Sequence, residues 1–417
     1  MSVTRKIIAE HAGRESVKPG EYAFVPVDLV LANDVTAPLA IDEFEKFDME
    51  VFSRDKIVFV LDHFTPNRDI ASAEQCSYVR QFALKKEIVH FYEGGLCGIE
   101  HVLLPEEGLI RPGSIVVGGD SHTCTYGALG SFATGMGSTD IGAAMAFGKA
   151  WLRVPEAILV RIKGKFRRWV GGKDLILKLI GMIGVDGATY RSLEFTGDGL
   201  ASLGIDARFT VANMVVEAGA KNGMFPVDEK TLDYLNSVGI QCDQMDIEPD
   251  QFGYSAEIGI DLDELSPQVA LPPTPENSVP VEDAPHVRLD QVVIGSCTNG
   301  RISDLRQAAE VIKGKKVARG LRLIVIPGSP RVYKQALKEG LIEILLDAGA
   351  VISPPTCGPC LGGHMGVLAA GEKALATTNR NFVGRMGHKE SEVYLCNPAV
   401  AAASSVTGTI TDPAEIV

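Results

Sequence analysis

The sequence predicts an α/β fold of three domains with parallel sheets. Runs of β-branched and apolar residues alternate with segments of helical periodicity, as expected when helices cover the faces of a sheet. With 417 residues, 46% hydrophobic content and 44 glycines, the chain can form two or three globular domains. The segment 262–287 is rich in proline and acidic residues, which is typical of a linker. We therefore expect domains at 1–155, 156–285 and 286–417.

The composition excludes several classes of function. The chain carries 40 lysines and arginines against 53 aspartates and glutamates, a formal net charge of −13, which argues against a sequence-independent grip on nucleic acid. No apolar run approaches the roughly 20 residues needed to cross a bilayer. The N-terminal residues lack the apolar segment of a secretory signal, and eight cysteines are too few for a disulfide scaffold. We expect a cytoplasmic protein with reduced cysteines.

In the first domain the pattern predicts helices at 3–12 and 72–86, and strands at 56–61, 88–92 and 114–117. The strand at 56–61 ends in Asp62-His63. A carboxylate beside an imidazole can fix its tautomer and raise its pKa, so this pair is a catalytic candidate. A turn with a surface histidine is the alternative interpretation.

Two further polar groups follow in the same domain. His101 lies inside an apolar run, where a histidine is more often a satisfied core residue than a catalyst. The strand at 114–117 leads into a glycine-rich loop that contains Asp120, Ser121 and His122. The loop lacks the G-x-S-x-G pattern of a nucleophilic serine. We interpret it as a polar loop that lines a site, and not as a hydrolase triad.

The second domain is predicted to hold strands at 157–162 and 190–195 and helices at 173–183 and 208–218. The third is predicted to hold helices at 300–313 and 330–347 and a strand at 321–326.

The third domain also carries the most distinctive cysteines. A short apolar strand at 292–294 delivers Cys297 at its carboxyl end, where open α/β sheets place their chemistry. Cys357 and Cys360 form a C-x-x-C pair in a turn rich in proline and glycine. The pair alone permits half of a structural zinc site, a redox dithiol, two cysteines that bridge nothing, or part of an iron–sulfur cluster. Farther along, Arg380 and Arg385 could clamp a carboxylate, or form structural salt bridges.

Five motifs occur together and in one order: Asp62-His63, Gly119-Asp-Ser-His122, Gly295-Ser-Cys-Thr-Asn299, Thr356-Cys-Gly-Pro-Cys360 and Asn379-Arg-Asn-Phe-Val-Gly-Arg385. In this combination the chain resembles the aconitase superfamily over essentially its whole length. The resemblance implies three α/β domains around a 4Fe–4S cluster held by Cys297, Cys357 and Cys360, with one iron open to substrate.

The resemblance also implies roles for the other motif residues. It assigns Asp62 and His63 to protonation of the leaving hydroxyl. It assigns positions beside the water at the open iron to His101, Asp120, His122 and Glu194. Substrate contacts are expected from Ser121, Arg380 and Arg385, and Asn299 and Asn379 are expected beside the cluster.

Finally, the resemblance implies a reaction and a partner. We expect dehydration and rehydration of a 2-hydroxy acid, with 2-isopropylmalate converted to 3-isopropylmalate and homoaconitate or a methylmalate as alternative substrates. The family's catalytic base lies on a swivelling domain for which this sequence has no counterpart. We therefore expect a separate small subunit to close the site. A zinc-stabilised binding module without catalysis is the alternative from another class.

Overall fold

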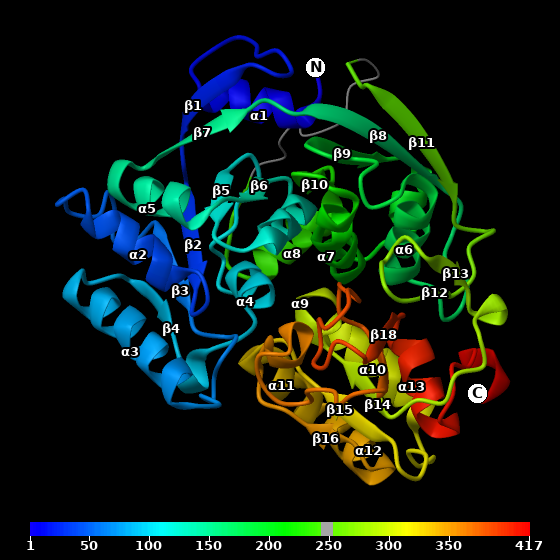
Figure 1. Cartoon of the computed structure of the whole chain (residues 1–417). Coiled ribbons are helices and arrows are strands. Elements are labelled where there is room, and N and C mark those ends of the chain that lie inside the picture. Colours follow the sequence, from blue (N-terminus) through cyan, green and yellow to red (C-terminus); the bar gives the residue numbers. More distant parts are fainter. Residues whose placement is uncertain (243–252) are drawn as a thin grey trace.

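In this computed structural model, which describes residues 1–242 and 253–417, the chain forms three groups of elements that follow one another in sequence. Figure 1 shows them as blue to cyan, green, and yellow to red groups packed around a common centre. The predicted α/β fold with parallel sheets is confirmed. Among the described residues, no helix is long and apolar enough to cross a membrane.

The first group contains a five-stranded parallel sheet in the order β4-β3-β2-β5-β6. Its strands are β2 (Leu29–Asn33), β3 (Ile57–Val60), β4 (His90–Tyr92), β5 (Ile115–Gly118) and β6 (Phe132–Gly135). The accompanying helices are α1 (Val3–His11), α2 (Ala37–Glu45), α3 (Ile70–Lys85), α4 (Glu100–Glu106) and α5 (Ser138–Phe147), with an antiparallel ribbon of β1 (Tyr22–Pro26) and β7 (Lys149–Arg153).

Both faces of the first sheet are buried, which explains the continuous apolar runs of its strands. Leu31 and Val58 point into a large core shared with the other two groups. Their neighbours Val30 and Phe59 point into a separate core under the first group's outer helices. The carboxyl ends of the strands therefore remain as the place where polar side chains can gather.

The second group contains a parallel sheet in the order β10-β9-β8-β11. Its strands are β8 (Glu156–Lys163), β9 (Arg191–Thr196), β10 (Asn222–Met224) and β11 (Ala256–Asp261), and its helices are α6 (Gly172–Ile183), α7 (Ile205–Met214) and α8 (Glu229–Ser237).

The third group contains a seven-stranded sheet in the order β13-β12-β18-β17-β14-β15-β16. Its strands are β12 (Gln268–Ala270), β13 (Ser278–Pro280), β14 (Gln291–Ile294), β15 (Arg322–Val325), β16 (Val351–Ile352), β17 (Lys373–Ala376) and β18 (Glu392–Leu395). Its helices are α9 (Ser296–Asn299), α10 (Ile302–Ile312), α11 (Pro330–Lys338), α12 (Leu341–Ala348) and α13 (Pro398–Thr407). Short 3₁₀ helices complete the described chain: η1 (Gly94–Leu96), η2 (Ser121–Leu129), η3 (Asp198–Ser202), η4 (Val215–Ala218), η5 (Val281–Asp283), η6 (Gly358–Leu361) and η7 (Pro413–Glu415).

The segment expected to be a linker, 262–287, contains two strands of the third sheet. β12 pairs antiparallel with β13 and, through Ala270 and Leu395, with β18. Prolines are tolerated here because these short strands lie at one edge of the sheet. By sheet membership, this part of the predicted second domain belongs with the third.

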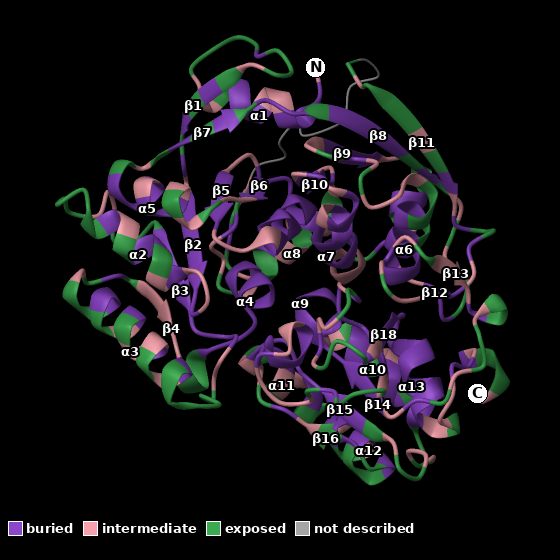
Figure 2. Ribbon diagram, in the orientation of Figure 1, coloured by how far each residue is buried: buried purple, intermediate pink, exposed green. Residues whose placement is uncertain are grey.

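The three groups meet at short buried elements. α7 contacts η2 and α9, and α4 contacts α9. Figure 2 shows α4, α7 and α9 near the centre, with mostly buried residues. One close approach is between Gly127 of η2 and β10, where a Cβ on Gly127 would lie 2.1 Å from the Gly223 carbonyl oxygen. The loop that carries Ser121 and His122 is thereby fixed against the second group.

Replacing Gly127 by alanine is expected to lower the free energy of unfolding by about 1–3 kcal/mol, because two backbone segments would have to separate. The matched control is Gly259→Ala in β11, where a Cβ meets no atom within 4 Å. Denaturant unfolding measures both variants. Equal stability of Gly127→Ala and wild type would contradict the described packing of η2 on β10.

Candidate active site

Three cysteine thiols meet beyond one edge of the third sheet. Cys297 follows β14 and the pair Cys357 and Cys360 follows β16, and all three are buried. The strands are parallel, so their carboxyl ends lie at the same edge of the sheet. Four other cysteines, Cys76, Cys97, Cys124 and Cys396, are also buried.

A left-handed turn delivers Cys297. Ser296 has φ +80°, an uncommon conformation for a residue with a side chain. Gly295 before it has φ +143°, and a Cβ there would lie 2.5 Å from the Ile326 carbonyl oxygen. The close approach of β14 and β15 therefore requires glycine at 295, and the turn after it directs Cys297 toward the centre.

The C-x-x-C turn is attached to the first group through Asp62. The Cys357 N–H donates to the Asp62 carbonyl oxygen at 2.8 Å, and the Thr356 hydroxyl donates to the same oxygen at 2.9 Å. This connection places the thiols beside the end of β3.

Two asparagine side chains contact the thiols directly. Asn379 Nδ2 and Asn213 Nδ2 each lie 3.3 Å from Cys297 Sγ, and Asn379 Oδ1 lies 3.2 Å from Cys360 Sγ. A hydrogen bond from the Cys357 thiol, with a further contribution from Arg385, lowers the pKa of Cys360 to about 6. A hydrogen bond from the same thiol lowers the pKa of Cys297, whereas its hydrogen bonds to these two sulfurs raise the pKa of Cys357. The neighbourhood therefore favours thiolates at Cys297 and Cys360, the form in which cysteine binds metals.

Asp62 and His63 form a buried ion pair at the end of β3. His63 Nδ1 lies 2.7 Å from Asp62 Oδ1 and 3.5 Å from Asp34 Oδ1. Asp34 also accepts the backbone N–H groups of His63 and Phe64. Burial alone would lower the pKa of His63, but the two carboxylates raise it well above its usual value. The ring is thus held as an imidazolium whose Nε2 is not engaged by Asp62.

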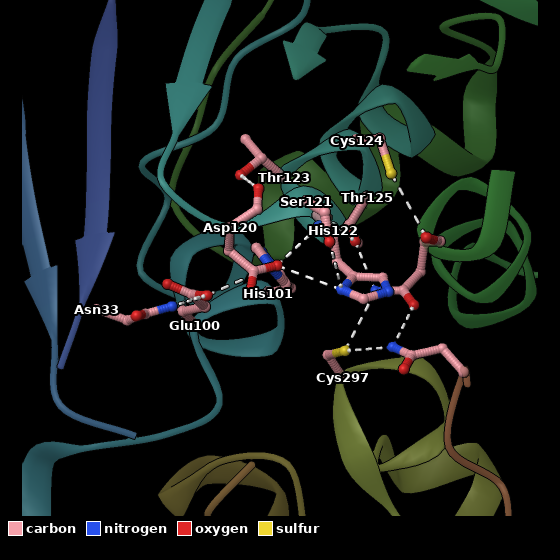
Figure 3. A network of polar contacts seen from close by, with 12 residues as sticks. Asn33, Glu100, His101, Asp120, Ser121, His122, Thr123, Cys124, Thr125 and Cys297 are labelled. Atoms are coloured by element: carbon pink, nitrogen blue, oxygen red, sulfur yellow. Dashed lines mark hydrogen bonds and ion pairs between the residues drawn. The ribbon is translucent and has the colours of Figure 1, made fainter. Parts of the chain in front are cut away.

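Asp120 joins two imidazoles (Figure 3). Its Oδ1 lies 3.0 Å from His101 Nε2 and 3.3 Å from His122 Nδ1. Burial would raise the pKa of Asp120, but hydrogen bonds from the two histidines hold it well below its usual range. His101 is the second residue of α4, and its Nδ1 lies 3.0 Å from the Tyr126 hydroxyl. His101 is therefore in a helix and part of a polar network, not a histidine within an apolar core.

Glu217 of η4 extends this network to the third group. Its Oε1 lies 2.9 Å from His122 Nε2 and accepts a hydrogen bond from Arg380 Nε at 2.8 Å. Arg380 also donates to the Ser121 hydroxyl at 3.0 Å. Burial and Arg380 lower the pKa of His122, but its bonds to Asp120 and Glu217 outweigh both and raise it to about 9.

Two polar atoms of this region lack hydrogen-bond partners among the described residues. They are Arg385 Nε and Glu100 Oε2, and both are buried. Buried polar atoms are almost always paired in native structures, so such atoms indicate a missing ligand or water. Arg385 and Glu100 line a small pocket together with Asp62, His63, His101, Asp120, His122, Asn379 and the three cysteines.

Four of the expected residues do not line this pocket: Ser121, Arg380, Glu194 and Asn299. Ser121 and Arg380 lie beside it, in contact with His122 and Glu217. The Glu194 carboxylate accepts the N–H groups of Val3 and Thr4 and the Tyr254 hydroxyl, so it caps α1. The acidic residue beside the histidines is Glu217 instead. Asn299 contacts Thr210, Asp304 and Lys173, and lines a different pocket behind the cysteines. In the structure, Glu194 and Asn299 therefore contact other parts of the chain than the pocket with the cysteines.

Sequence reasoning missed four residues that line the pocket or contact the residues that do: Asp34, Glu100, Asn213 and Glu217. It also missed Lys173, which lines the other pocket together with Asn299. One signal was available, because Asn213 and Glu217 are four residues apart in the predicted helix 208–218 and so share a face. Lys173 is buried, and its Nζ donates to the carbonyl oxygens of Thr377 and Thr378 at 2.8 and 2.5 Å. Burial lowers the pKa of Lys173 to about 8.

Comparison with known proteins identifies relatives over the whole chain. A model of the aconitase family (aconitate hydratase) matches residues 5–287 and 282–408. The 3-isopropylmalate dehydratase large subunit of Caldicellulosiruptor bescii is 59% identical over 418 residues, covering 100% of this chain and 97% of that protein. Those of Clostridium kluyveri and Acetivibrio thermocellus are each 57% identical over 100% of both chains. Among solved structures, aconitase X of Thermococcus kodakaraensis aligns with a TM-score of 0.48 at 14% identity, over 85% of this chain and 84% of that one.

The two glutamates can be separated by experiment. Glu217→Gln is expected to lower the pKa of His122, because it removes one of the two carboxylates that raise it. Glu194→Gln is expected to leave that pKa unchanged and to lower the free energy of unfolding by about 1–3 kcal/mol, the effect of weakening a buried carboxylate's hydrogen bonds. NMR titration of the histidine rings in the metal-free chain and denaturant unfolding measure these effects. If the pKa of His122 changed in Glu194→Gln and not in Glu217→Gln, the assignment of Glu217 as the glutamate beside His122 would be wrong.

Proposed function

The chain belongs to the aconitase family, and we propose that it is the large subunit of a 3-isopropylmalate dehydratase. It would convert 2-isopropylmalate to 3-isopropylmalate in the cytoplasm by removing and re-adding water, a step of leucine biosynthesis. The observation that carries the proposal is the single pocket in which three buried thiols face the Asp62–His63 pair and the histidines around Asp120. The relatives named above, which are 3-isopropylmalate dehydratase large subunits, support the proposal because they match this chain over its full length.

The thiols fit an iron–sulfur cluster. Cys297, Cys357 and Cys360 would hold a 4Fe–4S cluster, and Asn213 and Asn379 would donate hydrogen bonds to the ligand sulfurs. When bound, such a cluster with only three cysteine ligands supplies an open iron that acts as a Lewis acid toward the substrate hydroxyl. The soft sulfur donors suit iron–sulfur or zinc binding, and magnesium or calcium would prefer oxygen ligands.

His63 is the proton donor in this proposal. Its Nδ1 is engaged by Asp62, which leaves the Nε2–H to protonate the departing hydroxyl. Asp34 holds the backbone of His63 in place by accepting its N–H. The two carboxylates keep the imidazolium charged, so the proton is available at neutral pH before each turnover.

His101, Asp120 and His122 would hold the water that is removed and re-added. Asp120 orients both rings, and Glu217 fixes the far nitrogen of His122. Arg385, whose Nε lacks a partner among the described residues, and Ser121 would contact substrate carboxylates. Arg380 would act beside them from its place between Glu217 and Ser121.

Dehydration also requires a base that removes a proton from the neighbouring carbon. Within the described part of the pocket, Asp62 and Asp120 are engaged with the imidazoles, and Ser121 receives a hydrogen bond from Arg380. Glu100 has one oxygen without a partner, but burial and the neighbouring carboxylates raise its pKa well above the usual value, which disfavours the ionised form that a base requires. We therefore propose that a separate small subunit supplies the base and closes the pocket.

Anaerobically purified chain is expected to be brown and to contain iron and acid-labile sulfide. Cys357→Ser should lose most of the iron, because one of three ligands is replaced. Cys76→Ala is the matched control, since Cys76 is also a buried cysteine but lies in α3, outside the pocket. Zinc without iron or sulfide would reject the enzyme and favour the zinc-stabilised binding module.

The reaction is tested with the reconstituted chain and a cognate small subunit, by following the unsaturated intermediate in the ultraviolet. We expect 2-isopropylmalate to be preferred over homocitrate and citramalate. The isolated chain should be slower by at least about a hundredfold, the typical contribution of a general base. Preference for homocitrate or citramalate would contradict the substrate assignment. Comparable turnover without the small subunit would show that this chain carries the base.

A further inference from the structure

Glu100 is a buried glutamate whose side chain is only half satisfied. It begins α4, beside His101, and its side chain and backbone are 1% exposed. Its Oε1 accepts a hydrogen bond from Asn33 Nδ2 at 2.9 Å, whereas Oε2 has no partner among the described residues. Figure 3 shows Glu100 between Asn33 and the histidine network. The residue lines the same pocket as His63, Asp120 and the three cysteines.

A purely structural role does not explain this arrangement. Glu194, which is structural, is equally buried, and both of its oxygens accept hydrogen bonds. Glu106, at the other end of α4, accepts a hydrogen bond from the Ser329 hydroxyl. A carboxyl oxygen without a partner at the wall of a polar pocket indicates that its partner is a molecule that enters the pocket.

The neighbours of Glu100 determine its charge. One ligand-capable atom each of His63, Glu100 and Asp120 lie within 4.8 Å of one another. The Glu100 backbone N–H donates to Asp62 Oδ2 at 2.8 Å. Asp62 and Asp120 are therefore two nearby carboxylates, each already paired with imidazole. A third negative charge would be repelled by both.

The other groups around Glu100 do not reverse this balance. His101 Nε2 lies 3.4 Å from its Oε1, the Tyr126 hydroxyl lies 3.4 Å from its carbonyl oxygen, and His63 favours the ionised form. Burial, followed by Asp62 and Asp120, nevertheless raises the pKa of Glu100 well above its usual value. Because Asn33 donates to Oε1, the proton of the neutral acid lies on Oε2, the oxygen that has no partner.

We propose that Glu100 is a further residue of the catalytic pocket, a neutral acid that donates a hydrogen bond through Oε2 to an oxygen atom of the bound hydroxy acid. A neutral donor suits this place because an ionised glutamate would repel the carboxylates of the substrate. A buried carboxylic acid kept neutral by its surroundings can serve as such a donor. The inference rests on the proposed function and adds a substrate contact to it.

The test compares Glu100→Gln and Glu100→Leu in the reconstituted two-subunit enzyme, with Glu106→Gln as the matched control. Glutamine keeps an acceptor for Asn33 and a donor for the pocket, so Glu100→Gln should retain kcat/KM within about threefold near neutral pH. Glu100→Leu should lose about tenfold or more in kcat/KM, the effect of one hydrogen bond to a charged group. Iron per chain should be unchanged in all three variants.

The pH profile separates this role from a structural one. Glu100 is protonated below its raised pKa and ionises above it, so the wild-type rate should fall on the alkaline side as the donor is lost. Glu100→Gln cannot ionise, so its alkaline profile should lose the step that belongs to Glu100 and keep only the fall caused by deprotonation of His63, whereas Glu106→Gln should keep the wild-type profile. In addition, an infrared difference spectrum of wild type minus Glu100→Gln should show the carbonyl band of a protonated carboxyl group.

Several outcomes would overturn the inference. These are a tenfold loss in Glu100→Gln near neutral pH, unchanged kcat/KM in Glu100→Leu, an alkaline profile of Glu100→Gln identical to that of wild type, or no protonated carboxyl band. If wild type itself fails to turn over 2-isopropylmalate, the proposed function is wrong, and the infrared band then reports separately whether Glu100 is neutral.

Discussion

A row of alternating charges holds the three groups of elements together. Asp120 and His122 come from the loop after β5, Glu217 from η4, and Arg380 from the chain after β17, and each contacts the next. Removing one member of a buried pair typically costs about 3–5 kcal/mol, because its partner is left charged without a counter-charge. The same contacts that orient the histidines also fix the relative positions of the three sheets. A substitution that breaks one of these contacts is therefore expected to change both the packing of the three groups and the geometry of the pocket.

Lys173 adds a positive charge on the other side of the cysteines. Its ammonium group donates to the carbonyl oxygens of Thr377 and Thr378, and no carboxylate lies within ion-pair distance of its Nζ in the part of the chain that the structure describes. Burial lowers its pKa to about 8, and the nearby thiols of Cys396, Cys360 and Cys297 act in the opposite direction. An anionic group on the cysteines would give this buried cation its counter-charge. Because the two threonine carbonyls immediately precede Asn379, Lys173 also fixes the chain that carries the Asn379 contact to the ligand sulfurs.

The sequence predicted what depends on local pattern, and failed where partners are distant. The helix at 3–12 and the strand at 56–61 match α1 and β3 within one residue, because apolar periodicity specifies each of them. The C-x-x-C pair and Asp62-His63 are local motifs, and the structure brings both to the pocket. Glu217 carries no motif, and its function depends on contacts with residues 95 and 163 positions away. Glu194 has an equally suggestive position inside a strand, but its partners are the first turn of α1. The spacing of Glu217 from Asn213 was a weak signal, and the contacts in the fold distinguish the two glutamates.

The two arginines expected to clamp carboxylates are not equivalent. Arg380 has its Nε committed to Glu217 and its Nη2 to Ser121, so its position is determined before any substrate arrives. Arg385 has a buried Nε without a partner among the described residues, and its Nη2 makes only a long contact, 3.9 Å, to Cys360 Sγ. Leaving guanidinium donors unpaired is costly unless a ligand completes them. Of the two arginines, Arg385 is thus the one that keeps a donor without a partner among the described residues. Arg380 sets the electrostatic environment of the pocket by balancing Glu217, which in turn maintains the charge on His122.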